Sequence, residues 1–346
     1  VALPSIASAL NATDTELTGI TDAYQLGIAA TVLYLGAVGD RYGRKGMLLL
    51  GALLCVPFSL ASAWSPNAVF LIVAQIAVGV AGGMLYPTTL SMITALWRGK
   101  KLTGAIALWT GLGTGASVLG PIMGGYLLDN YWWGSVFLIT VPFALLVLVM
   151  GAIILPRSRA AEKAPVDHAG GSLSVVMISS FVLGIVMLPQ GITITVAILF
   201  AVTLVSGTLF VWRQKRAPNP LFDLELAAVP TFWVAFVAGL VAFGALVGAM
   251  FIGQQFTQNV LRYTPLHAVL LTLALAIGML PASVFAGKLI GKRGTRFTFI
   301  IGMVFIAFGF VEMLIAWRAG TAEVWVVLAY LLVGIGIGMA ATPASR

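Results

Sequence analysis

The chain has 346 residues, of which 60% are hydrophobic and only 9% charged, and its mean hydropathy is +1.05. This composition excludes an ordinary water-soluble domain and predicts an all-α integral membrane protein. The net charge of +8 does not indicate a nucleic-acid partner, because no basic face is interleaved with aromatic residues. Cys55 is alone, and His168 and His267 both occupy predicted loops, so neither a metal site nor an enzyme is expected.

Apolar windows of the roughly 20 residues that cross a bilayer recur along the whole chain. The sequence predicts eleven spans, preceded by an apolar stub at 1–10. In chain order the spans lie near 18–38, 47–64, 68–96, 103–127, 133–155, 172–189, 192–212, 230–256, 266–290, 297–317 and 323–343. Because the chain starts inside an apolar run and stops directly after a span, we interpret it as a fragment with about eleven full spans.

The loops carry an orientation signal. If the apolar stub runs outward, every second loop lies in the cytoplasm. These loops are the segments around 39–46, 97–102, 156–168, 213–226 and 288–296. They contain all 19 Lys and Arg residues except Arg262, Arg318 and Arg346. This bias follows the positive-inside rule, so we expect a multi-pass protein of a bacterial inner or plasma membrane, with affinity for anionic lipid.

The first of these loops is a dense charged turn, GAVGDRYGRK, between two membrane-length segments. Its glycines allow a sharp reversal and a close approach of two helices, and its acid and three cations offer a lattice of ion pairs. The residues concerned are Gly36, Asp40, Arg41, Gly43, Arg44 and Lys45. We expect Asp40, Arg41 and Arg44 to form a cytoplasmic gating latch.

A second turn repeats the first, 251 residues later, although its acid is replaced by Gly291. The matched pairs are Gly36 with Gly287, Gly43 with Gly294 and Lys45 with Arg296. A similar offset, 255 residues, aligns GVAGGM at 79–84 with GIGIGM at 334–339. The sequence therefore predicts two pseudo-symmetric six-helix halves with an inserted two-helix hairpin.

This repeat sets the predicted domain limits. Residues 1–155 form the N-terminal six-helix half with a truncated first helix. Residues 156–226 hold a linker and the two extra helices, joined by a very short turn. Residues 227–346 hold the first four helices of the C-terminal half, whose last two are missing from the chain.

The span at 103–127 carries a glycine pattern that suits a hinge. Glycines four residues apart clear a stripe along which another helix can approach closely, and a proline bends the helix. The residues are Gly111, Gly115, Gly120, Pro121, Gly124 and Gly125. Ordinary packing of small residues is the alternative interpretation.

Two acids lie inside predicted spans, where a charge is costly and is a functional candidate. Asp22 shares a helix face with Thr18 and Gln25 and is either a site that exchanges a lipophilic cation for a proton or a hydrated anchor. Glu312 is either a second protonation site or a side chain that reaches the interface.

Two uncharged residues complete the predicted substrate and proton-coupling set. Gln254 either lines a cavity or caps an interface. Trp109 either stacks on an aromatic cation or faces lipid.

Together these motifs resemble the major facilitator superfamily of transporters. The charged turn is similar to its signature loop between helices two and three, and the pattern at 120–125 is similar to the antiporter motif of its exporters. The hairpin at 172–212 and a reconstructed total of fourteen spans resemble the QacA-like drug:proton antiporters. Asp22-Ala23-Tyr24, Pro87-Thr88-Thr89-Leu90 and Asn219-Pro220-Leu221-Phe222-Asp223 also match that branch. The resemblance covers essentially the whole chain.

The resemblance implies a monomeric secondary transporter that exports lipophilic, cationic drugs or toxins in exchange for protons by alternating access. It implies no cofactor, with the proton gradient as the energy source, and the chain has no phosphate-binding loop for ATP. One departure weakens the case for proton coupling. Where the family often has Arg in helix four, followed by Gln-Gly, this chain has Gln75, Val78 and Gly79.

Three alternatives stay open. The chain is either a specific exporter of a siderophore, antibiotic or metabolite, an uncoupled facilitator, or a membrane sensor or remnant that does not transport. Efflux assays with several dye cations separate the transport alternatives, and turnover in proteoliposomes excludes the sensor.

Overall fold

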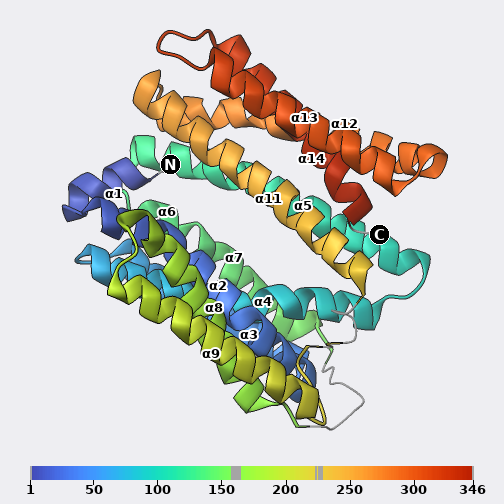
Figure 1. Ribbon diagram of the computed structural model, residues 1–346. Coiled ribbons are helices and arrows are strands. Elements are labelled where there is room, and N and C mark those ends of the chain that lie inside the picture. The colour runs from blue at the N-terminus through green and yellow to red at the C-terminus, as the bar shows by residue number, and fades with distance from the viewer. Residues whose placement is uncertain (1, 157–164, 223, 225–228, 345–346) are drawn as a thin grey trace. The chain divides into compact units, whose positions relative to one another are not determined.

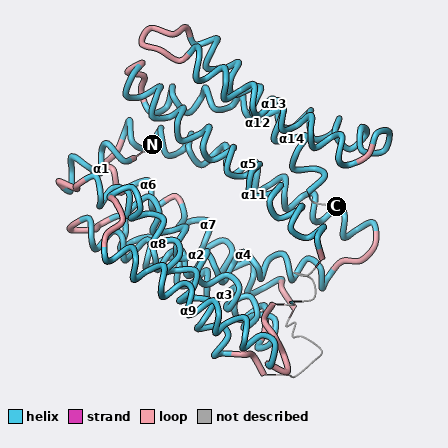
Figure 2. The backbone as a smooth tube through the Cα atoms, viewed as in Figure 1, coloured by secondary structure: helices cyan, strands magenta, loops and turns pink. Residues whose placement is uncertain are grey.

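The computed structural model describes residues 2–156, 165–222, 224 and 229–344, and within these ranges all regular structure is helical (Figure 2). In chain order (Figure 1) the helices are α1 Leu3–Leu10, α2 Asp14–Tyr42, α3 Arg44–Ala63, α4 Ala68–Leu96, α5 Lys100–Asn130, α6 Ser135–Leu138, α7 Thr140–Ile154, α8 His168–Met187, α9 Ile194–Arg216, α11 Pro230–Gln255, α12 Pro265–Arg293, α13 Thr295–Ala316 and α14 Glu323–Ala344. A 3-10 turn, Leu188–Gln190, follows α8, and a π-helical turn, Phe256–Val260, continues α11.

Ten of the eleven predicted spans fall on one helix each, and the span at 133–155 falls on two, α6 and α7. In the part of the chain that the structure describes, nine helical segments are long and apolar enough to cross a membrane. The two other predicted spans fall on α2 and α5, which have 29 and 31 residues. Of these, α2 carries Asp22 and Gln25 within its length. The prediction of a helical multi-pass membrane protein is confirmed, and the total of eleven spans stays a prediction.

The predicted span at 133–155 is divided into α6 and α7. Pro142 has no backbone N–H, so it cannot donate to the Leu138 carbonyl, and its ring crowds that carbonyl. Ile139, between the two helices, keeps helical dihedrals of φ −54° and ψ −37°. The segment therefore continues in the same direction as one membrane-length unit.

The start of α2 is fixed by a capping box. The backbone N–H and the hydroxyl of Thr13 both donate to the Glu16 carboxylate at 2.9 Å, and the Glu16 N–H donates back to the hydroxyl at 3.4 Å. These hydrogen bonds hold the pKa of the Glu16 carboxyl below its ordinary value. The cap starts α2 before the predicted span, because hydrogen bonding rather than hydropathy determines where a helix begins.

The chain divides into two units. The N-terminal unit comprises Ala2–Gly113 and Tyr131–Leu224, and the C-terminal unit comprises Thr114–Asn130 and Glu225–Arg346. In the N-terminal unit α4 packs along α2 and α3, α7 lies on α3, and the α8–α9 hairpin lies on α2 through α8 (Figure 1). In the C-terminal unit α14 packs against α11, α12 and α13. The domain limits derived from the repeat stay a prediction.

Glycines let the central helices of the N-terminal unit cross at backbone contact. A Cβ at Gly79 of α4 would clash with the carbonyl oxygen of Tyr24 on α2. In return, a Cβ at Gly27 of α2 would clash with the carbonyl oxygen of Ile76 on α4. Only glycine at both positions permits this approach.

The C-terminal unit repeats that crossing between α12 and α14. A Cβ at Gly334 would clash with the Leu275 carbonyl oxygen, and a Cβ at Gly278 would lie 2.5 Å from the Leu331 carbonyl oxygen. These four residues are the counterparts of the N-terminal four at the offsets found in the sequence, 251 residues on the first helix and 255 on the second. The internal repeat is thus present in the packing as well as in the sequence.

The two charged turns share a backbone conformation too. Gly43 ends α2 and starts α3 with φ 137°, and Gly294 ends α12 and starts α13 with φ 85°. A residue with a Cβ is strained at such angles. Each turn therefore reverses the chain within a single glycine.

Candidate functional site

The charged turn is held within the N-terminal unit by Asp40. Its Oδ1 accepts a hydrogen bond from Arg44 Nε at 2.6 Å and a very short one from the hydroxyl of Ser91, near the end of α4. The Asp40 side chain is 44% exposed, whereas that of Arg44 is 18% exposed. Asp40 therefore links α2, the first turn of α3 and the last turns of α4, and Ser91 is a partner that the sequence did not single out.

Lys45 makes a different contact. Its Nζ donates to the carbonyl oxygens of Ala152 and Leu155 at 2.7 Å each, at the end of α7. Carbonyl oxygens in the last turn of a helix have no hydrogen-bond donor within the helix, and they carry the partial negative charge of the helix dipole. The Lys45 ammonium group supplies both a donor and a compensating positive charge. Gly36 packs against Pro87 of α4, and Arg41 also has an interaction partner.

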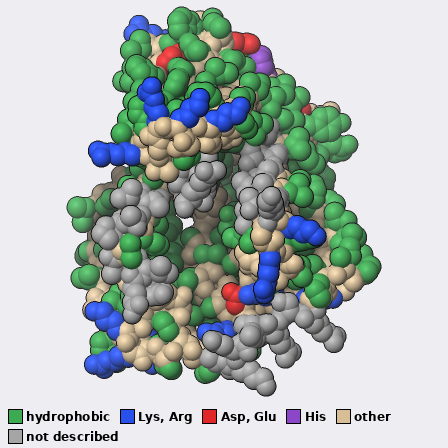
Figure 3. All heavy atoms as spheres, turned by 90° about the vertical axis from the view of Figure 1, so that its right-hand side faces the viewer, with side chains coloured by type: hydrophobic (Ala, Val, Ile, Leu, Met, Phe, Trp, Pro, Cys, Tyr) green, Lys and Arg blue, Asp and Glu red, His purple; other side chains and the backbone are tan. Residues whose placement is uncertain are grey.

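Basic side chains gather at the helix ends where the charged turns lie. Figure 3 shows Lys and Arg side chains in blue at helix ends within each unit. The distribution agrees with the loop charges that predict the cytoplasmic side, and that orientation stays a prediction.

Asp22 lies on α2 and is half-buried, and Gln25, one turn further on, is exposed. In the part of the chain that the structure describes, the half-buried Asp22 carboxylate has no hydrogen bond or ion pair. A partly buried carboxylate without a counter-ion is a site where a cation or a proton gains binding energy. Asp22 is thus the strongest single candidate in the N-terminal unit.

The departure at Gln75 has a structural explanation. Gln75 is buried in α4, and its Nε2 donates to the hydroxyl of Ser62 on α3 at 2.9 Å. In the family that the sequence resembles, this position often holds Arg. In this chain, Gln75 occupies it and forms a neutral hydrogen bond between α4 and α3.

Trp109 of α5 packs against Tyr86 of α4, with ring centroids 5.4 Å apart and planes at 55°. Tyr86 is an exposed aromatic side chain that the sequence did not single out. Among the contacts of the described residues none joins this pair to Asp22. The aromatic pair and the acid are therefore two separate candidate features of the same unit.

The glycine pattern of α5 is only partly described. All of its residues lie within one helix, which contains Pro121, but the surroundings of Gly111 and Gly115 lie outside what the structure describes. Gly124 and Gly125 are buried, whereas a Cβ at Gly120 would have no neighbour within 4 Å. The stripe of close approach predicted for this motif stays a prediction.

In the C-terminal unit, Glu312 of α13 lies beside the half-buried indole of Trp317. Both carboxylate oxygens of Glu312, Nε1 of Trp317 and the hydroxyl of Tyr330 are buried and have no hydrogen-bond partner among the described residues. The Trp317 indole is the donor that faces Glu312, although the two do not meet hydrogen-bond geometry. Trp317 stacks on Phe256 at 4.7 Å and meets the Tyr330 ring edge-on at 6.0 Å. Such unpaired polar atoms in a core mark a candidate functional cluster.

Glu312 also borders a cavity of about 620 Å³ at the end of α13, together with Arg318, Thr321 and Trp325. Gln254 lies elsewhere on α11, where its side chain accepts a hydrogen bond from Gln258 at 3.3 Å. No contact of the described residues joins Gln254 to Glu312. The structure therefore gives Glu312 a partly polar opening and does not group it with Gln254.

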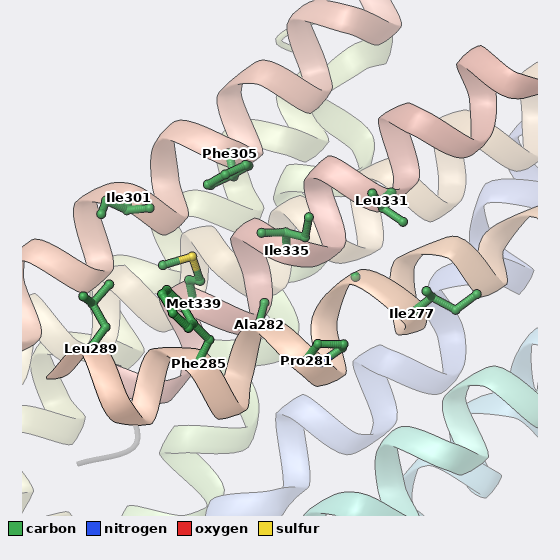
Figure 4. Close-up of a pocket in the computed structure, with 11 residues that line it drawn as sticks. Ile277, Pro281, Ala282, Phe285, Leu289, Ile301, Phe305, Leu331, Ile335 and Met339 are labelled. Carbon is green, nitrogen blue, oxygen red and sulfur yellow. The ribbon is translucent and has the colours of Figure 1, made fainter. Parts of the chain in front are cut away.

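A second cavity, of about 470 Å³, lies between α12, α13 and α14. Figure 4 shows apolar side chains of all three helices around it, among them Pro281, Phe285, Phe305 and Ile335. Nothing that lines it is charged, so it suits hydrocarbon and offers no recognition of a cationic group.

Both histidines lie in helices, so their assignment to loops is wrong, and the position of His267 agrees with the predicted span at 266–290. His168 is the first residue of α8, where the side chain of Asp167 caps the helix, and His267 lies in the first turn of α12, which Thr264 caps. The cap starts α8 four residues before the predicted span at 172–189, whereas α12 begins within one residue of the predicted span at 266–290.

Comparisons with known proteins agree on one family. The chain matches the Major Facilitator Superfamily over residues 1–345. It is 35% identical to the multidrug efflux pump LfrA of Mycolicibacterium smegmatis, over 99% of this chain and 68% of LfrA. It is 29% identical to the multidrug resistance protein Stp of Mycobacterium tuberculosis, over 99% of this chain and 64% of Stp. It is 31% identical to the methyl viologen resistance protein SmvA of Salmonella typhimurium, over 90% of this chain and 63% of SmvA. The chain spans about two thirds of the length of these relatives.

Solved structures agree on the fold. A POT family transporter in complex with a thioalcohol-conjugated peptide aligns with a TM-score of 0.65 and 16% identity, over 97% of this chain and 75% of that one. A peptide transporter POT in complex with sulfate gives a TM-score of 0.60 and 18% identity, over 97% and 79%. From the sequence match, the relatives and the helical fold, the chain belongs to the Major Facilitator Superfamily of membrane transporters.

Proposed function

We propose that the protein exports lipophilic, cationic drugs in exchange for protons, by alternating access, as a member of the fourteen-span QacA-like branch. The printed names of its relatives support drug export, since LfrA is a multidrug efflux pump and Stp a multidrug resistance protein. The name of SmvA adds methyl viologen, a dication, which supports a cationic substrate. The protein acts as a monomer and needs no cofactor.

Asp22 is the observation that carries the proposal. A half-buried carboxylate on a membrane helix, without a counter-ion among the described residues, attracts either a proton or an organic cation. If only one of them binds at a time, the arrival of the drug releases the proton, and the two fluxes are coupled. Within the N-terminal unit, Gln25 shares the helix face of Asp22, and Trp109 offers an aromatic surface to a cationic substrate. Gln254 is a polar candidate of the C-terminal unit.

The coupling must rest on acids, because the helix-four position that often holds Arg is occupied by Gln75 in a neutral hydrogen bond to Ser62. Glu312 serves as the second proton site, since its buried, unpartnered carboxylate is next to a cavity with an exposed rim. The charged turn and the glycines of α5 provide the gating contacts. The extra α8–α9 hairpin supports the fourteen-span branch.

The direct experiment uses the purified full protein in liposomes with an imposed pH gradient. Ethidium serves as a monocationic probe and methyl viologen as a dicationic probe. We expect both to move against the proton flux, and a protonophore to abolish their accumulation. Transport that persists at the same rate without a gradient identifies an uncoupled facilitator. Transport of neither cation, despite correct insertion, contradicts the proposal and favours a narrow specificity or a protein that does not transport.

A further inference from the structure

A hydrogen-bonded cluster between α2 and α8 lies outside the candidate transport residues. His168, the first residue of α8, faces two tyrosines of α2. The Tyr34 hydroxyl lies 2.8 Å from its Nδ1, and the Tyr42 hydroxyl lies 3.2 Å from its Nε2. The imidazole stacks on the Tyr42 ring at 6.2 Å and meets the Tyr34 ring edge-on at 5.9 Å. One histidine thus spans two turns of α2.

A neutral imidazole satisfies both contacts at once. One of its nitrogens accepts a hydrogen bond from a tyrosine hydroxyl, and the other donates its N–H to the second hydroxyl oxygen. The hydrogen bonds therefore need both ring nitrogens, placed on opposite edges of a rigid ring. An apolar side chain at this position cannot replace either contact.

The histidine is anchored to a braced hairpin. The neighbouring Asp167 is buried and accepts hydrogen bonds from Gly170 N at 3.1 Å, from Arg213 Nε at 3.1 Å and from Gln214 Nε2 at 3.2 Å. Since Arg213 and Gln214 lie at the end of α9, Asp167 joins the two open ends of the α8–α9 hairpin.

Gln214 extends this brace into the segment after α9. It is buried, and its Oε1 accepts hydrogen bonds from the backbone N–H groups of Leu221 at 2.6 Å and Phe222 at 3.2 Å. Gln214 therefore holds the segment at Leu221 and Phe222 to the end of the hairpin where His168 meets α2.

Steric fit adds to the hydrogen bonds. Gly171, one turn along α8, lies directly against the Tyr34 ring, and a Cβ there would clash with three of its carbon atoms. The helices can approach this closely only with glycine at that position. The staple, defined as His168 with Tyr34 and Tyr42, therefore rests on packing as well as on hydrogen bonds.

The staple ends at the charged turn. Tyr42 is the last residue of α2, two residues after Asp40 and immediately before Gly43, the hinge of the turn. Holding Tyr42 therefore holds the backbone that presents Asp40 to Ser91 and Arg44. We infer that His168 is a positioning residue for the charged turn, through which the α8–α9 hairpin and the gating end of α2 move as one body. This inference rests on the proposed function only for its transport readout.

The first test needs no substrate. Amide hydrogen exchange is measured on the purified protein for wild type, His168→Leu, His168→Gln and the control Tyr131→Phe, which removes the hydroxyl of an exposed tyrosine in the same unit. Loss of the staple by His168→Leu should speed exchange roughly tenfold at 39–46, with no change at the start of α2. His168→Gln, which keeps one donor and one acceptor, should retain part of the protection. Unchanged exchange at 39–46 in His168→Leu overturns the inference.

The second test replaces the staple by a covalent link in a Cys55→Ser background. Tyr42→Cys and His168→Cys are introduced together and joined by a short bifunctional thiol reagent. In the unlinked form we expect a lower maximal rate of cation export with an unchanged KM, and linking should restore the rate. A link that arrests export, or an unlinked form as fast as the background, contradicts the inference. If the background itself exports no cation, the proposed function fails, and the exchange measurement still decides on the staple.

Discussion

At the scale of single residues, the charged turn works through complementary partners rather than through charge density alone. Asp40 accepts from a guanidinium and from a hydroxyl, whereas Lys45 donates to two backbone carbonyls. Hydrogen bonds that involve a charged group are stronger than neutral ones and lose more when one partner is removed. The two residues therefore call for different tests, one of transport and one of stability.

Replacing Asp40 with Asn should abolish export while the protein still inserts. The amide keeps the shape and can still accept from Ser91, but it no longer attracts Arg44, so the turn loses its ionic contact. We expect a drop in the export rate of at least about tenfold, which corresponds to ~1.4 kcal/mol. The measurement is dye efflux at matched protein levels, with Asp129→Asn, an exposed acid of α5, as the control. Normal efflux by Asp40→Asn would refute a gating role.

Replacing Lys45 with Met should lower stability. Methionine keeps most of the aliphatic chain but leaves the carbonyls of Ala152 and Leu155 without their donor. We expect a loss of about 1–3 kcal/mol in the free energy of unfolding, measured by thermal or denaturant unfolding in detergent. Lys101→Met, which removes an exposed lysine of α5, is the matched control. Equal stability of the two variants would contradict the capping role.

At the scale of helices, the molecule depends on glycines where central helices touch, and the repeat allows the same experiment in both units. Gly79→Ala and Gly334→Ala should each cost about 1–3 kcal/mol through overpacking against a backbone carbonyl. Gly46→Ala and Gly287→Ala, where a Cβ meets nothing within 4 Å, should be neutral or slightly stabilising. The melting temperatures of the four variants test this expectation. A loss of stability in only one unit would contradict the view that the α2–α4 and α12–α14 crossings are equivalent.

The glycine pattern of α5 can be tested by a contrast inside one helix. Gly124 is buried and Gly120 is open, so leucine should be tolerated far better at position 120 than at 124. We expect Gly124→Leu to give lost or leaky efflux with retained insertion, since its hydropathy rises. Dye export is the measurement. Equal export by the two variants would indicate that these glycines face lipid and have no role in gating.

At the scale of the whole molecule, hydropathy and loop charges predicted the helical membrane fold, because a bilayer demands long apolar helices and little else. The repeat was predictable from two glycine motifs, and the structure confirms it at the crossings of α2 with α4 and α12 with α14. The family prediction is confirmed by the match over residues 1–345. Branch, substrate and coupling stay predictions.

Contacts between distant segments could not be predicted. Ser91 meets Asp40, and His168 meets Tyr34 and Tyr42, only because α4 and α8 lie beside α2, which no local pattern encodes. The same holds for the rings of Phe256 and Tyr330 that contact Trp317. Spacing along one helix identifies a face, but the partners of that face depend on how the helices pack.

The central claim is that Asp22 exchanges a proton for a cationic substrate. The most direct measurement is proton release on adding methyl viologen or ethidium to weakly buffered, detergent-solubilised protein. We predict proton release by the wild type and by Asp129→Asn. Asp22→Asn should release none, because its amide side chain carries no titratable proton. Undiminished release by Asp22→Asn would contradict the account and leave Glu312 as the remaining candidate acid.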